Sequence, residues 1–165
     1  MKIIAAVNKN WGIGKDNDLL YHIPGDMKFF RSKTKDNIII VGRKTLESFP
    51  EGKPLKFRTN IVLTKNTDYF AEDAVIKHSV DDILAYLKDF PEKEIYVCGG
   101  AQIYELLLPF CSEAYITKID DDSEAEKFMP NLDSHQDWKL TEESQSFREN
   151  GYSYKFCTYK NINYK

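Results

Sequence analysis

Asp26 is the carboxylate of this sequence best placed to do chemistry. It lies in the first turn of a helix predicted over residues 24–33, among the apolar side chains Met27, Phe29 and Phe30. A carboxyl group in an apolar cleft has a raised pKa and pairs with a cationic or donor-rich ligand. Alternatively, Asp26 only complements the positive end of the helix dipole.

Three cations follow two neighbouring predicted strands. Arg43 and Lys44 belong to the run Gly42-Arg43-Lys44-Thr45, and Lys65 follows the next strand in an equivalent place. An arginine can grip a phosphate with two parallel hydrogen bonds, and a lysine adds a point charge. The set predicts a pocket for a phosphate monoester, and the alternative is a solvated basic surface.

The pair Gly99-Gly100 lies between a predicted strand and a predicted helix. Glycines at that point let the backbone approach a phosphate closely. The alternative is a tight turn with no ligand. The sequence lacks the G-x-G-x-x-G fingerprint of dinucleotide-binding folds. The triplet Gly12–Gly14 does not replace that fingerprint, because no helix follows it directly.

The remaining polar groups predict neither a metal site nor a protein nucleophile. His22, His78 and His135 have no spacing suited to a metal or a catalytic dyad, and no G-x-S-x-G motif is present. The acidic residues of segment 120–126 do not have the spacing of a calcium-binding loop, so a solvated loop is the better interpretation.

The elements that must position these residues alternate along the chain. Strand-like apolar runs and helix signals predict a single α/β domain over residues 1–165, with a mostly parallel twisted sheet flanked by about four helices. Ser79, with Asp82 three residues later, resembles a capping box, and Asn150-Gly151 is a hairpin turn signal that predicts an antiparallel C-terminal hairpin. Strands are predicted over 2–8, 38–41, 59–64, 75–77, 94–98, 114–119, 138–147 and 152–159, helices over 24–33, 43–49, 79–89 and 101–108, and a loop over 10–18. Ligands of such sheets bind at the carboxyl ends of the strands.

Composition narrows the class of protein. The chain has 165 residues, of which 42% are hydrophobic and 30% are charged, and its net charge is −3, which argues against disorder and against a nucleic-acid-binding protein. Residues 1–66 carry 13 Lys and Arg against 6 Asp and Glu, whereas residues 67–165 carry 10 against 20, so a basic half is available for a small anion. Three scattered cysteines, no apolar run of membrane-spanning length and no signal peptide predict a cytoplasmic protein with reduced thiols. No apolar stripe demands a partner, so a monomer is expected.

Four motifs, in order along nearly the whole chain, resemble those of bacterial dihydrofolate reductases. The first comprises Ala5-Ala6-Val7, Trp11-Gly12-Ile13-Gly14, Asn17, Ile23-Pro24-Gly25-Asp26-Met27 and Phe29-Phe30. The others are Val41-Gly42-Arg43-Lys44-Thr45-Leu46-Glu47-Ser48, Val97-Cys98-Gly99-Gly100-Ala101-Gln102-Ile103-Tyr104, and Thr117-Lys118-Ile119 with the acidic loop after it. One such motif is weak evidence, but four with the right spacing are strong.

The resemblance implies reduction of 7,8-dihydrofolate to tetrahydrofolate, with NADPH as the cofactor and dihydrofolate and diaminopyrimidine or pteridine antifolates as ligands. It implies that Asp26 holds the pterin and favours protonation of the imine that receives hydride. Thr117 would support that carboxylate through a hydrogen bond, and Tyr21 would supply a donor near it. Hydride transfer needs no protein nucleophile and no metal, in agreement with the residues present.

The resemblance also implies the lining of both binding sites. The implied substrate contacts are Ala6, Asp26, Met27, Phe30, Phe49, Leu55, Arg58, Cys98 and Thr117, with Arg58 gripping the α-carboxylate of the glutamate tail. The implied cofactor contacts are Ala6, Ile13, Gly14, Asn17, Leu19, Gly42, Arg43, Lys44, Thr45, Leu63, Thr64, Lys65, Cys98, Gly99, Gly100, Ala101, Gln102, Ile103 and Tyr104.

Three positions depart from the family's pattern. Leu20-Tyr21 stands where a Pro-Trp pair is usual, Ala125-Glu126 replaces Gly-Asp, and Cys98 replaces an aliphatic residue. Two other interpretations stay open. One is a reductase of the riboflavin-pathway type, which would not require Asp26 together with Arg58. The other is a pterin-binding module that has lost catalysis, which only the departures at Tyr21 and Ala125-Glu126 favour.

Overall fold

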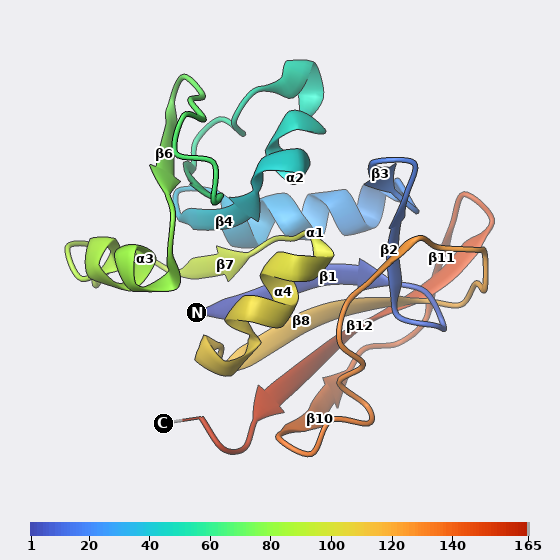
Figure 1. The fold of residues 1–165 in the computed structure, drawn as a ribbon. Coiled ribbons are helices and arrows are strands. Elements are labelled where there is room, and N and C mark those ends of the chain that lie inside the picture. Colours follow the sequence, from blue (N-terminus) through green and yellow to red (C-terminus); the bar gives the residue numbers. More distant parts are fainter. Residues whose placement is uncertain (165) are drawn as a thin grey trace.

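A twisted nine-stranded sheet forms the centre of the computed structural model, which describes residues 1–164 (Figure 1). Its strand order is β10-β12-β8-β1-β7-β4-β5-β6, and β11 also pairs with β12. The six strands from β8 to β6 are parallel, whereas β12 runs antiparallel to β8 and β10 runs antiparallel to β12. Its strands are β1 (Lys2–Val7), β4 (Ile38–Gly42), β5 (Thr59–Leu63), β6 (Ala74–Lys77), β7 (Ile95–Val97), β8 (Glu113–Ile119), β10 (Trp138–Glu143), β11 (Phe147–Glu149) and β12 (Tyr152–Asn161). The predicted fold class is confirmed.

Helices cover both faces of the sheet, because successive residues of a strand point to opposite sides. The four helices are α1 (Pro24–Thr34), α2 (Arg43–Glu47), α3 (Val80–Leu87) and α4 (Ala101–Leu107). Ile39 and Val41 of β4 share clusters with residues of α1 and α2, whereas Ile38 and Ile40 share a core with α3 and α4. The central strands are therefore buried on both faces, as their continuous apolar runs predict.

Helix starts follow local sequence signals. Pro24 occupies the start of α1, where its missing N–H costs no hydrogen bond. The Ser79 hydroxyl oxygen accepts the backbone N–H of Asp82 over 3.1 Å and caps α3, as predicted. Pro109 lies inside a short 3₁₀ turn, Leu108–Phe110, which continues α4 for a few residues beyond its α-helical part.

The Ser79→Ala variant should lose about 1 kcal/mol of unfolding free energy, the usual cost of removing such a cap. Chemical denaturation monitored by circular dichroism measures this value. Ser134→Ala is a matched control, because the Ser134 side chain is exposed and donates to the carbonyl of Asn131 instead of capping a helix. Equal losses in the two variants would contradict a specific capping role.

The predicted loop over residues 10–18 is wrong in part. A three-stranded sheet of order β3-β2-β9 occupies this region, with β2 at Gly12–Lys15, β3 at Asp18–Leu19 and β9 at Lys127–Phe128. Glycine is a poor strand former, so the local sequence gave no strand signal. The pairing partner β9 lies over a hundred residues away, and its contacts stabilise the strand.

The predicted hairpin needs one correction. Asn150 and Gly151 form the turn with φ of 52° and 82°, as their types predict. The strand predicted over 138–147 is instead divided into β10 and β11, with an interruption at Ser144–Ser146. Two hydrogen bonds join Ser144 to Phe156 at this point. The backbone N–H of Ser144 donates to the carbonyl of Phe156, and the hydroxyl oxygen of Ser144 accepts the N–H of Phe156. The pairing of β10 with β12 also shifts in register between Leu140 and Glu142. An irregularity of this kind adds a residue to one strand and bends it.

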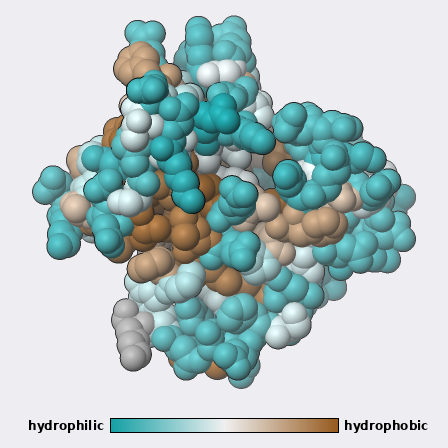
Figure 2. Space-filling view, viewed as in Figure 1, coloured by the Kyte–Doolittle hydropathy of each residue, from teal (hydrophilic) through white to brown (hydrophobic). Residues whose placement is uncertain are grey.

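The surface drawn in Figure 2 has hydrophobic side chains gathered over the middle of the molecule and hydrophilic ones around them. Among residues 1–164, no helix has the length and apolar character needed to cross a bilayer. Cys98, Cys111 and Cys157 are all free thiols.

Candidate active site

Asp26 and Thr117 meet where α1 crosses the face of β8. The Thr117 hydroxyl donates to Asp26 Oδ1 over 2.6 Å, and Thr117 is buried while Asp26 is half-buried. Burial raises the pKa of the Asp26 carboxyl, and the hydrogen bond from Thr117 opposes part of that rise. A carboxyl in this position can hold a proton or bind a donor-rich group at a pH where an exposed aspartate would be fully ionised.

Apolar side chains pack together on the face of the sheet that α1 covers. Phe30 of α1, Ile39 of β4 and Phe49, Leu55 and Cys98 from the loops after α2 and β7 belong to one cluster. Cys98 also packs against the cluster at the carboxyl end of β4 and β5, so it lies between the two groups of apolar residues. Burial raises the pKa of its thiol, which therefore stays neutral. The walls suit a flat aromatic ligand.

Asn60 holds one of these walls in place. Its side chain accepts the N–H of Leu55 over 3.0 Å and donates to the carbonyl of Leu55 over 2.9 Å. Asn60 is buried on β5, so it fixes the loop that carries Leu55 to the sheet. Met27, which follows Asp26 in α1, has 41% of its surface exposed.

Arg58 lies next to Phe30 of α1. Its guanidinium carbon is 5.8 Å from the centre of the Phe30 ring. Its Nε donates to the hydroxyl of Thr34 over 2.7 Å, and its Nη1 donates to the carbonyl of Lys56 over 2.7 Å. Burial lowers the pKa of Arg58, but an arginine remains charged at any physiological pH. The residue offers a fixed cation beside an aromatic wall.

Two strand-to-helix turns lie against each other at the carboxyl edge of the sheet. The N–H of Gly42 donates to the carbonyl of Gly99 over 2.9 Å. A Cβ on Gly42 would lie 3.1 Å from the Ile103 side chain, and a Cβ on Gly100 would lie 3.5 Å from the Thr45 hydroxyl. Gly99 has φ of +114°, a conformation that side chains disfavour. Glycines at these positions let the two backbones approach each other closely.

The predicted phosphate-binding cations lie at this same edge, on exposed positions. Arg43 pairs with Glu47 over 3.1 Å on the surface of α2, while Lys44 and Lys65 are exposed. Thr64 accepts the side chain of His78 through its carbonyl, at 2.8 Å. An exposed ion pair such as Arg43–Glu47 contributes little stability, so an anionic ligand can displace Glu47 at small cost.

The chain is similar in sequence and in fold to proteins of a known enzyme family. The sequence model described as "Dihydrofolate reductase" matches residues 1–161. The dihydrofolate reductase of Bacillus subtilis is 38% identical over 99% of this chain and 95% of its own length, and that of Enterococcus faecium is 42% identical over 92% and 90%. The structure of the Enterococcus faecalis dihydrofolate reductase, complexed with NADP(H) and RAB-propyl, has a TM-score of 0.87 and 34% identity, and covers 98% of this chain and 96% of its own.

The chain belongs to the dihydrofolate reductase family. The resemblance seen in the sequence is thereby confirmed over the whole described fold.

Tyr21, predicted to be catalytic in this family member, does not reach Asp26. Its ring is buried against Ile23 and Tyr154, and its hydroxyl donates to Asp121 in the acidic loop. Burial and this carboxylate raise the pKa of the phenol. The hydroxyl therefore fastens the acidic loop to the body of the protein, and any influence on Asp26 passes through that loop.

The first five of the implied cofactor contacts lie on β1, β2, β3 and the turn between β2 and β3. Ala6 is the partner of Thr117 in the β1–β8 register, which places it beside Asp26. Gly14 accepts the N–H of Glu126 through its carbonyl, and Glu126 Oε1 accepts the N–H of Asp16, so Glu126 joins the β2–β3 segment to the acidic loop at both points. Asn17 and Leu19 are exposed at its tip, and Ile13 packs on the main core.

The remaining predicted cofactor residues line the two turns at the carboxyl edge of the sheet. Ala101, Gln102 and Ile103 form the first turn of α4. Tyr104 is buried and its hydroxyl donates to the carbonyl of Ile4 over 2.8 Å. Leu63 is only 8% exposed and packs in the main core, so its side chain points away from this surface and only its backbone can contact a ligand there.

Sequence reasoning missed three residues that position the site. Thr34 holds Arg58. Asn8 is buried, accepts two backbone N–H groups of the following loop and donates to the carbonyl of Ser123 in the acidic loop. Glu149 lies on the C-terminal hairpin. Its side chain accepts the N–H of Gly25 over 2.7 Å and thereby caps the helix that carries Asp26. Each of these three residues contacts at least one residue that is more than twenty positions away along the chain, so no local motif could reveal these roles.

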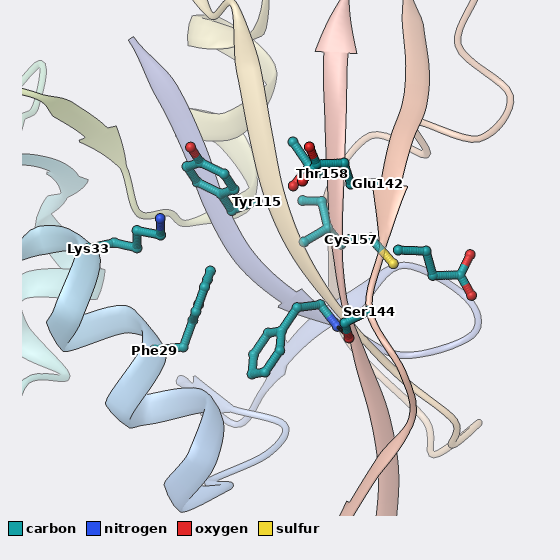
Figure 3. Close-up of a pocket in the computed structure, with 10 residues that line it drawn as sticks. Phe29, Lys33, Tyr115, Glu142, Ser144, Cys157 and Thr158 are labelled. Atoms are coloured by element: carbon teal, nitrogen blue, oxygen red, sulfur yellow. Dashed lines mark hydrogen bonds between the residues drawn. The ribbon is translucent and has the colours of Figure 1, made fainter.

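A groove of about 400 Å³ lies on the other flank of α1 (Figure 3). Phe29, Lys33, Tyr115, Phe156 and Glu142 are among its lining residues, and Lys33 Nζ lies 4.9 Å from the centre of the Tyr115 ring. None of the predicted site residues lines this groove. The groove is lined from α1, β8, β10 and β12.

Proposed function

We propose that this chain reduces 7,8-dihydrofolate to tetrahydrofolate at the Asp26 site, with NADPH as the reductant. The observation that carries this proposal is the Asp26–Thr117 pair, because burial raises the pKa of this carboxyl while the Thr117 hydroxyl holds it in place. Arg58, beside Phe30, adds a fixed cation. A carboxyl of this kind suits a donor-rich ring, and a guanidinium suits a carboxylate.

Asp26 has two tasks in this reaction. Its carboxylate binds the amino group and ring nitrogen of the pterin, both of which are donors. It also favours the protonated form of the imine that accepts hydride, because a protonated imine is more electrophilic. Thr117 fixes the orientation of the carboxyl, and the apolar walls keep bulk water away from it.

Arg58 and the apolar walls orient the rest of the substrate. The guanidinium pairs with the α-carboxylate of the glutamate tail, and Phe30, Phe49 and Leu55 contact the benzoyl ring between the two polar ends. Fixing the substrate at both ends converts binding energy into orientation of the reacting ring.

The residues at the carboxyl edge of the sheet fit a dinucleotide phosphate. Glycines 42, 99 and 100 keep the backbone of the two turns open to close approach, and a side chain at Gly42 would press on Ile103. Arg43, Lys44 and Lys65, with the hydroxyls of Thr45 and Thr64, would hold the phosphates, including the 2′-phosphate. NADPH supplies the hydride when bound.

The chain is expected to prefer NADPH strongly over NADH, because only NADPH carries the 2′-phosphate that these cations would pair with. Arg43→Ala should raise the Michaelis constant for NADPH about 10-fold with little change in turnover, the pattern of lost uniform binding. The assay follows NADPH oxidation in the presence of dihydrofolate. Arg148→Ala, on an exposed strand away from this edge, is the matched control. Equal use of NADH by the wild-type protein would overturn the cofactor assignment, and no oxidation that depends on dihydrofolate would overturn the proposed function.

The same site also fits the antifolate ligands that we propose. Diaminopyrimidine and pteridine antifolates present a protonated or donor-rich ring to Asp26, and Cys98 contributes to the shape of the wall that they meet. We propose that the protein acts as a cytoplasmic monomer, in keeping with its three free thiols.

A further inference from the structure

Thr34 joins the catalytic helix to Arg58 through one hydroxyl group. Thr34 is the last residue of α1 and has 0% of its surface exposed. Its Oγ1 donates to the carbonyl of Phe30 over 2.8 Å and accepts the Nε–H of Arg58 over 2.7 Å. Residues 34 and 58 are 24 positions apart, so the contact exists only in the folded chain.

The contact with Phe30 fixes the direction of this hydroxyl. A threonine hydroxyl has a single hydrogen and two acceptor lone pairs. Because the hydrogen is used by the helix carbonyl, the lone pairs are left to face Arg58. The hydroxyl hydrogen of Thr34 therefore does not point at the guanidinium N–H groups, which it would repel.

The guanidinium is thereby held at three points. Thr34 accepts from Nε, the carbonyl of Lys56 accepts from Nη1, and the guanidinium carbon lies 5.8 Å from the centre of the Phe30 ring. A guanidinium has five N–H donors. Within residues 1–164, the two hydrogen bonds use two of them and leave three on Nη1 and Nη2, to which a carboxylate can bind.

We propose that Thr34 is a positioning residue that determines how strongly the site selects substrates with a carboxylate tail. The proposal rests on the proposed function in assigning that tail to Arg58. Thr34 does not touch the substrate; it holds the arginine so that its free edge faces the carboxylate. Without it, Arg58 would have to lose side-chain freedom during binding, at a cost in affinity.

Thr34→Val keeps the shape and burial of the side chain but removes the acceptor. The Michaelis constant for dihydrofolate should rise about 10-fold with little change in turnover, because a hydrogen bond to a charged group is lost. A dihydropterin without the benzoyl-glutamate tail should be reduced as efficiently as before. Thr34→Ser restores the hydroxyl and should restore the wild-type constant, whereas Thr141→Val, on an exposed strand position, should change neither substrate's constant.

A double-variant cycle separates positioning from a general structural role. In the Arg58→Leu background, Thr34→Val should have no further effect on dihydrofolate, because the residue it positions is gone. Thr34→Ala provides a second removal of the hydroxyl, and thermal unfolding of each variant checks that the fold is retained. An equal loss for both substrates, or an undiminished loss in the Arg58→Leu background, would overturn the proposal.

Equilibrium binding keeps this test independent of the proposed reaction. Quenching of protein fluorescence gives dissociation constants for dihydrofolate and for the tail-less dihydropterin without any turnover. A weaker affinity of Thr34→Val for dihydrofolate alone supports the positioning role, even with a wild-type protein that does not oxidise NADPH. Equal affinities of wild type and Thr34→Val for dihydrofolate would refute it, even with a wild-type protein that is fully active.

Discussion

Asp26→Asn is expected to lower turnover by about 10²- to 10⁴-fold at about pH 7, the usual effect of removing a group that manages a proton. The amide keeps the shape of the side chain and still accepts the hydrogen bond from Thr117. It cannot carry the charge that favours the protonated imine. Steady-state assays of NADPH oxidation with saturating dihydrofolate measure the loss.

The pH dependence of the two proteins should differ. Wild-type turnover should fall as pH rises above neutrality, because the imine is then harder to protonate. The Asp26→Asn variant should recover part of its activity at low pH, where solvent protonates the substrate directly. The matched control is Asp89→Asn, which changes an exposed carboxylate two residues after α3 and should behave as wild type. Turnover of Asp26→Asn close to wild type at every pH would show that another residue performs this role.

The stability of the same variant gives an independent check on the environment of Asp26. Burial raises the pKa of this carboxyl in the folded state above its value in the unfolded chain. The folded protein therefore holds the proton more tightly, and this contribution to stability is present at low pH and is lost as pH rises through the folded pKa. The free energy of unfolding of Asp26→Asn minus that of wild type should therefore be larger at neutral pH than at acidic pH. Denaturation curves at several pH values measure the difference, and a gap that does not change with pH would contradict the burial.

The elements that the sequence predicts well are those specified by neighbouring residues. Pro24 starts α1, Ser79 caps α3, and Asn150-Gly151 turns the last hairpin, because each signal acts within a few residues. The apolar runs of β1, β4 and β5 are continuous because both faces of these strands are covered. Alternation of strands and helices then implies the parallel order and places the loops that carry the site at one edge.

The elements that the sequence misses depend on distant partners. The strand β2 is rich in glycine, and its identity as a strand comes from β9, which contributes only two residues of its own. The interruption between β10 and β11 follows from how Ser144 bonds to Phe156 on the neighbouring strand. Neither feature has a periodicity or turn signal in the local sequence.

The candidate site divides in the same way. Asp26 and the glycine turns were found because residue type and position next to an element suggest their chemistry. The contact of Tyr21 with Asp121 cannot be predicted in this way, because the sequence does not show which carboxylate accepts the hydroxyl hydrogen. The groups that hold site residues in place, such as Asn60 beside Leu55, show themselves only when the fold brings them together.

Arg58→Leu is expected to weaken dihydrofolate binding by about 2–4 kcal/mol, because a charge-assisted bidentate contact is lost and the substrate carboxylate is left without a partner. At about 1.4 kcal/mol for each factor of ten, the Michaelis constant should rise roughly 30- to 1,000-fold. Leucine keeps an apolar contact with Phe30, so the wall of the benzoyl site is retained.

The comparison that isolates this effect uses two substrates and one control. A dihydropterin without the benzoyl-glutamate tail has no carboxylate for Arg58, so its reduction should be almost indifferent to Arg58→Leu. Arg148→Leu removes an exposed arginine on β11 and should leave both substrates unaffected. Equal losses for both substrates would mean that Arg58 serves the fold, through its hydrogen bonds to Thr34 and Lys56, and not the substrate tail. A loss confined to the tailed substrate would instead assign this end of the pocket to recognition of the carboxylate and the Asp26 end to the chemistry.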